Sequence, residues 1–186
     1  MNLNQITAEL DFVSACVKSI NVKAHLSKIS DGNDKEFGMD IKCSKPEVHG
    51  DRKTGCLRMQ VFVRIKPENQ AGEDDEFDIV LDGKFTSDAD VADDKFLRLL
   101  NINGGAALYA IARTKIEALS ALTYEDGKVL LPMINIIQYY QEMSAEKVLD
   151  TNSTITALST EMDDLKEAWR KDQKTFFSDI MQAENN

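Results

Sequence analysis

The residue types that carry out catalysis or bind metals are few in this sequence, and their spacing matches no common site. The two histidines, His25 and His49, lie in polar, turn-like stretches. Neither has a histidine, glutamate or cysteine at the spacing that a zinc site requires. We therefore interpret both as surface histidines and expect no metal site.

Aspartates and glycines form two further groups that could bind an ion or a phosphate. Four aspartates cluster between residues 88 and 94, but the glycine and the terminal glutamate of a calcium-binding loop are missing at their required offsets. Carboxylates at the start of a helix, where they complement the helix dipole, explain the cluster better. The pair Gly104-Gly105 lacks the GxGxxG or GxxxxGK[ST] context of a phosphate-binding loop and is interpreted as a break before a helix. Without a nucleophile, base or cofactor motif, we expect a protein that is not an enzyme and holds no cofactor.

Cysteine usage and charge restrict the compartment and the partners. Cys16, Cys43 and Cys56 form an odd set without a CxxC pair, which favours reduced, structural thiols. The 22 Lys and Arg against 32 Asp and Glu give a formal net charge of −10, and such a surface repels phosphate backbones and anionic lipid. No apolar run approaches the ~20 residues of a membrane span, and no signal-peptide pattern opens the chain. We expect a cytoplasmic protein that neither binds nucleic acid directly nor inserts into a membrane.

Strand patterns fill the first half of the chain. Every second residue is apolar in residues 37–43, 57–65 and 77–81, and the last pattern resumes at Phe85 beyond Gly83, which gives each of three strands one apolar face. Residues 3–23 mix two phases, and a long strand with a bulge or bend explains the mixture. Because polar, turn-rich connectors separate successive strands, the sequence predicts an antiparallel meander.

Helix patterns fill the second half. Apolar residues recur at i, i+4, i+8 and i+11 in Leu108, Ala112, Ile116 and Leu119, the spacing of an amphipathic helix that covers the apolar face of a sheet. Residues 134–143 are apolar almost all round, so this segment is either buried or a binding surface.

The last section has a stripe of its own. After Asp150, apolar residues recur at alternating steps of three and four, at Ile155, Leu158, Met162, Leu165 and Trp169. This stripe is typical of a helix that docks on a partner, and a solvated helix packed on its own core is the alternative. The whole sequence thus predicts an α+β fold, with a four-stranded antiparallel sheet followed by a long helix, a second apolar helix and an extra C-terminal helix. Residues 1–149 would form the main domain and residues 150–186 a C-terminal amphipathic helical extension.

The helical half resembles that of the SecB export chaperones. The matching residues are Gly104-Gly105, Leu108-Tyr109-Ala110-Ile111-Ala112-Arg113, Ile116, Leu119 and Leu131-Pro132-Met133-Ile134-Asn135, followed by an aromatic-rich helix. Four strands precede these residues in both, and the first strand's Lys18-Ser19-Ile20-Asn21-Val22 and the fourth strand's Gly83 and Phe85 are similar as well. The resemblance covers residues 4–143.

This resemblance implies an ATP-independent holdase, which binds unfolded or partly folded clients in apolar grooves next to the second helix. It also implies a dimer of dimers, and we expect a homotetramer because the apolar content of residues 104–143 exceeds what one small sheet covers. The expected client-binding residues are Met133, Ile134, Ile137, Tyr140 and Met143, with the strand residues Val17, Phe62 and Val80. We expect these three strand residues to lie on the face of the sheet opposite the main apolar face. Burial in a core or an oligomer interface would explain each expected client-binding residue equally well.

The sequence departs from the export chaperones where they dock the translocation ATPase SecA. Two acidic positions of that docking face correspond to Ser19 and Lys23, and only Asp78 keeps its charge. Because an ammonium in place of a carboxylate reverses the attraction, we expect SecA to dock poorly. SecB-like proteins also serve as dedicated chaperones of toxin–antitoxin systems, where they hold an aggregation-prone antitoxin, and we favour that role. The expected partner-docking residues are Asp78, Leu158, Met162, Leu165 and Trp169.

Three other functions stay open from the sequence. The first is a general export chaperone that delivers precursors to SecA. The second is a structural adaptor whose helix over residues 155–180 binds one folded partner. The third is an enzyme of unrecognised type, which acids or histidines converging in a buried pocket would support.

Overall fold

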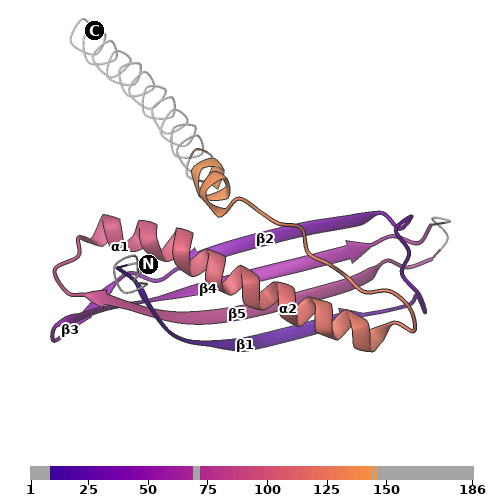
Figure 1. Ribbon diagram of the computed structural model, residues 1–186, viewed down its shortest axis with the longest axis horizontal. Coiled ribbons are helices and arrows are strands. Elements are labelled where there is room, and N and C mark those ends of the chain that lie inside the picture. Colours follow the sequence, from indigo (N-terminus) through magenta and orange to yellow (C-terminus); the bar gives the residue numbers. More distant parts are fainter. Residues whose placement is uncertain (1–8, 69–71, 144, 146–186) are drawn as a thin grey trace, which may run out of the picture. The chain divides into compact units, whose positions relative to one another are not determined.

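The computed structural model describes residues 9–68, 72–143 and 145. The chain divides into two units, residues 1–137 and 138–186, and the first unit holds the sheet and its covering helices (Figure 1). The expected extension over residues 150–186, including Leu158, Met162, Leu165 and Trp169, lies outside the described residues. The expected boundary between residues 149 and 150 also lies outside them.

The described strands form one antiparallel sheet of five strands. They are β1 (Asp11–Lys23), β2 (Lys35–Cys43), β3 (Glu47–His49), β4 (Arg52–Ile65) and β5 (Asp75–Asp88). The long strands lie in the order β1-β5-β4-β2, and the short β3 pairs with the start of β4. This arrangement confirms the mixed α and β class with an antiparallel sheet.

The strand order contradicts the expected meander. β1 pairs with β5 instead of β2, so residues 24–34 must cross three inter-strand spacings of about 4.8 Å each to reach the opposite edge. Buried Asp75 fixes the start of this crossing, because its Oδ1 accepts hydrogen bonds from the backbone N–H of His25 at 2.7 Å and of Leu26 at 3.3 Å. The fifth strand, β3, arises because Gly50, at φ 65°, lets the chain turn back after two residues.

The mixed apolar phase of β1 has the expected cause. Its register against β5 shifts between Phe12 and Ser14 and again between Val17 and Ser19. Each shift inserts one extra residue and moves the following side chains to the other face.

A continuous helical rod lies obliquely over one face of the sheet (Figure 1). It consists of α1 (Asp93–Leu99), the π-helix η2 (Leu100–Gly104) and α2 (Gly105–Thr123). The expected break at Gly104-Gly105 is therefore wrong, since both glycines have right-handed helical backbone angles. At Gly104 the missing side chain serves close packing instead, because a Cβ there would lie 3.2 Å from the Phe85 ring.

The core lies between this rod and the sheet. Along β4 and β5 the buried side chains alternate with more exposed ones, as the period-two pattern predicts. The core side chains from the sheet are Leu57, Met59, Val61, Val63, Ile65, Phe77, Ile79, Leu81 and Phe85, and those from the rod are Phe96, Leu100, Leu108, Ala112 and Ile116. Residues 124–135 leave the rod and return over the same side of the sheet, and residues 136–143 are helical. None of the helices in the described ranges has the length and hydrophobicity needed to cross a membrane.

Candidate functional site

An open groove separates α2 from the returning segment of residues 132–136. Its volume is about 520 Å³. The α2 wall of the groove combines three small residues with three large polar ones, and the other wall is apolar. The lining residues are Ala106, Tyr109, Ala110, Arg113, Thr114, Glu117, Met133, Ile134 and Ile136.

Helical periodicity brings the α2 residues of the groove together. Ala106, Ala110 and Thr114 are spaced four apart, so they share one stripe of the helix, and all three are exposed. The buried stripe of α2, which contains Leu108, lies on a neighbouring side. The helix therefore packs on the sheet and presents its small residues to the groove at the same time.

Hydrogen bonds between α2 and the returning chain set the width of the groove. The Tyr109 hydroxyl donates to the carbonyl oxygen of Pro132 at 2.7 Å. Nearer the end of α2, the Ser120 hydroxyl oxygen accepts a hydrogen bond from the backbone N–H of Val129 at 2.8 Å. Burial raises the pKa of Tyr109, while the nearby positive charge of Arg113 acts in the opposite direction. The Tyr109 hydroxyl thus stays protonated and keeps its bond to Pro132 at neutral pH.

Two charged side chains stand at the groove. Glu117 forms an ion pair with Lys128, with 2.5 Å between Oε1 and Nζ. Arg113 is half-buried, and its Nη1 donates to the sulfur of Met133 at 2.8 Å. Apart from these groups and the hydroxyls of Tyr109 and Thr114, the groove offers apolar surface, which suits the binding of an apolar side chain or chain segment.

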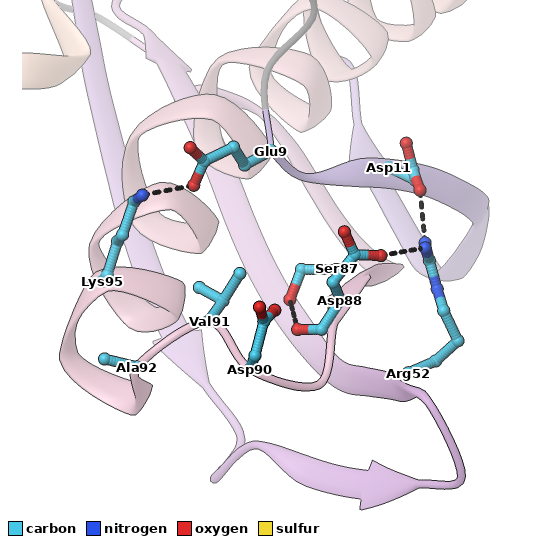
Figure 2. Close-up of a pocket in the computed structure, with 9 residues that line it drawn as sticks. All are labelled: Glu9, Asp11, Arg52, Ser87, Asp88, Asp90, Val91, Ala92 and Lys95. Carbon is cyan, nitrogen blue, oxygen red and sulfur yellow. Dashed lines mark hydrogen bonds and ion pairs between the residues drawn. The ribbon is translucent and has the colours of Figure 1, made fainter.

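A second pocket is charged and lies at the end of the sheet near the start of α1. Figure 2 shows its lining side chains, around a volume of about 660 Å³. Its two cations are already paired, Lys95 with Glu9, and Arg52 with both Asp11 and Asp88. Because both cations are engaged in ion pairs and the remaining lining charge is negative, the apolar groove is the stronger candidate for a binding site.

No protein-family model matches the sequence, and no curated protein does. Among solved structures, the chain is similar to the Mycobacterium tuberculosis SecB-like chaperone Rv1957, in complex with a ChAD peptide from the HigA1 antitoxin. The two are 12% identical, with a TM-score of 0.50, over 68% of this chain and 91% of that chain. The likeness shows a shared fold.

The structure places two of the expected client-binding residues in the groove. Met133 is 81% exposed and lines the groove together with half-buried Ile134. Ile137 is 53% exposed but lies outside the lining. Tyr140 and Met143 are half-buried on helical residues of the second unit.

The three expected strand residues do not share one surface. Phe62 and Val80 lie on the side of the sheet opposite the helices, as expected, because they alternate with core residues along β4 and β5. Val17 was expected on that side as well, but it pairs with the core residue Leu81 and faces the helix side. The register shift near Val17 causes the difference. A bulge adds one residue to the strand, so the alternation of side chains between the two faces on one side of the bulge does not predict the faces on the other side.

The residues relevant to SecA docking lie on the side of the sheet that faces away from the helices. Asp78 is half-buried there, and both of its carboxylate oxygens accept hydrogen bonds from Gln60. Lys23 pairs with Glu76, at 2.8 Å between Nζ and Oε2. Of these positions, Lys23 is therefore paired with an opposite charge, Asp78 is hydrogen-bonded to a neutral amide, and Ser19 on β1 is uncharged.

Arg113 and the small residues of α2 were not predicted as parts of the groove. Arg113 was named only among the residues that resemble the SecB chaperones. The stripe Ala106, Ala110 and Thr114 gave a signal, since small residues at this spacing mark a helix face that other groups can approach closely. No local sequence pattern predicts that residues 132–136 return beside that stripe.

Proposed function

We propose that this protein is an ATP-independent holdase chaperone whose groove, between α2 and residues 132–136, binds apolar segments of unfolded or partly folded client proteins. The observation that carries the proposal is the open groove with Met133 exposed at its edge. Burying a methionine side chain is worth roughly 1.5–3 kcal/mol. A client segment bound in the groove would gain this free energy by burying Met133, and smaller contributions by covering the neighbouring apolar wall.

A dedicated antitoxin client is the second part of the proposal. The structural neighbour of the same fold was solved with a peptide from an antitoxin, which supports an extended chain segment as ligand. Among the three expected SecA-docking positions, Lys23 is paired with Glu76 and Ser19 is uncharged, so only Asp78 still offers a negative charge. A role in toxin–antitoxin control is therefore favoured over delivery of export precursors, and the protein would act in the cytoplasm as a homo-oligomer.

The groove can be tested by filling it. Ala110→Trp places a large ring in the groove from an exposed position of α2, so the core should stay intact. Ala118→Trp is the matched control, because Ala118 is exposed on the same helix and does not line the groove. Aggregation of a chemically unfolded client is followed by light scattering with each variant, after thermal melting has shown that both are folded.

We expect Ala110→Trp to lose most of the suppression of aggregation, while Ala118→Trp behaves as wild type. Equal suppression by both variants would show that clients bind elsewhere. Co-purification from native cells tests the proposal of a dedicated antitoxin client. We expect a single co-encoded antitoxin, whereas a spread of secretory precursors would favour the role in protein export.

A further inference from the structure

The groove carries one positive charge that no acidic side chain compensates. Among its lining residues only Arg113 and Glu117 are charged at neutral pH, and Glu117 is paired with Lys128. Within the described part of the chain, no carboxylate lies within ion-pair distance of Arg113, whose polar contact is the sulfur of Met133. The local charge is therefore +1, although the whole chain carries −10.

The sulfur of Met133 is a poor partner for a guanidinium. A thioether is only a weak acceptor, whereas the five N–H donors of arginine match the two oxygens of a carboxylate. Arg113 is held beside the apolar wall, where a charge-assisted hydrogen bond is stronger than in open water. A carboxylate that displaced the Met133 sulfur would therefore form a better bond at the same place.

We propose that Arg113 determines which client segments the groove accepts, and that these segments carry an acidic residue next to an apolar one. This inference rests on the proposed function. The apolar side chain lies on the small residues Ala106, Ala110 and Thr114, and the neighbouring Asp or Glu pairs with Arg113. The net charge of −10 disfavours an acidic segment on the surface as a whole, and within the groove Arg113 fixes the position of the segment.

Two labelled peptides test the proposal. Both carry the same short run of aliphatic and aromatic residues, flanked by aspartates in one peptide and by asparagines in the other. Fluorescence anisotropy gives the dissociation constant of each with wild type, Arg113→Gln and Lys115→Gln. Lys115 is the matched control, because it is exposed on α2, does not line the groove and carries the same charge.

With wild type and Lys115→Gln, the aspartate peptide should bind about two- to fivefold more tightly than the asparagine peptide, the range of a partly exposed ion pair. Arg113→Gln should abolish this difference, and Arg113→Glu should favour a third peptide that carries lysines. Equal binding of the first two peptides to wild type would overturn the role of Arg113 and leave the groove as a binding site. If none of the peptides bound, or if Ala110→Trp bound them as wild type does, the groove would not be the client-binding site and the proposed function would be wrong.

Discussion

At the scale of single residues, a buried carboxylate joins three segments that are distant in the sequence. Asp75 has no exposed surface. Its Oδ1 accepts from the backbone N–H of His25, and its Oδ2 accepts from the hydroxyl of Tyr124 at 2.7 Å. The contact ties the end of α2 and the crossing segment to β5, and so fixes the point from which the chain returns toward the groove.

The Tyr124 hydroxyl should make stability depend on alkaline pH. Burial, and then the hydrogen bond and negative charge of Asp75, raise the pKa of Tyr124 above its ordinary 10.0. Above pH 10 the unfolded chain releases this proton while the folded protein keeps it, so the free energy of unfolding should fall by up to about 1.4 kcal/mol per pH unit. Urea unfolding at pH values below and above 10 measures the slope. Tyr124→Phe should be less stable at neutral pH and should show a smaller alkaline slope, and an unchanged slope would disprove the assignment.

At the scale of elements, the helical rod lies close to the sheet because glycines stand beneath it. A Cβ on Gly55 of β4 would lie 2.6 Å from Cε1 of Phe96 in α1, and a Cβ on Gly83 of β5 would lie 2.9 Å from Leu108 in α2. Both distances are shorter than ordinary van der Waals contact. The distance between rod and sheet therefore depends on these two positions as much as on the large core residues.

Gly55→Ala should accordingly destabilise the fold, because Phe96 must shift from its packed position. We expect a loss of about 1–3 kcal/mol in the free energy of unfolding, the usual cost of overpacking a core. Cys56→Ala is the control, since Cys56 is the next residue, is exposed and faces away from the rod. It should change stability by less than about 0.5 kcal/mol. Thermal or urea unfolding compares the two, and equal stabilities would mean that the core adapts to the added methyl group.

At the scale of the whole molecule, the helix side of the sheet is incompletely covered. α2 crosses the sheet obliquely (Figure 1), whereas the edge strand β1 keeps an apolar row partly exposed. Phe12 is 49% and Ile20 45% exposed in this row, which Val17 and Val22 continue. Among the described strands β1 stands at the edge of the sheet, so its outer backbone groups can pair with another strand. An exposed row of this kind is expected at an interface between subunits.

Light scattering should therefore show a homotetramer, as the resemblance to SecB implies. Ile20→Lys places a charge in the apolar row and should shift the protein toward smaller species. Ser19→Lys is the matched control, because Ser19 lies on the other side of the same strand and is exposed. If wild type were a stable monomer at micromolar concentration, the expected assembly would be wrong. If both variants dissociated equally, the interface would not involve the apolar row of β1.

The sequence by itself determined the features that repeat locally. The alternation of buried and exposed residues in β4 and β5, the amphipathic α2 and the bulged β1 follow from side-chain periodicity, which each segment carries without its neighbours. Met133 and Ile134, expected from the resemblance to bind clients, do line the groove, and their role as client-binding residues stays a prediction.

Tertiary structure alone decided which segments meet. The pairing of β1 with β5 joins residues far apart in the sequence, and a periodic pattern specifies the face of a strand but not its neighbour. The side on which Val17 lies depends on where the bulges fall in that pairing. The groove, with Arg113 in its lining, forms where the hydrogen bond from the Tyr109 hydroxyl to Pro132 holds residues 132–136 beside α2. Contacts of this kind leave no local pattern in the sequence.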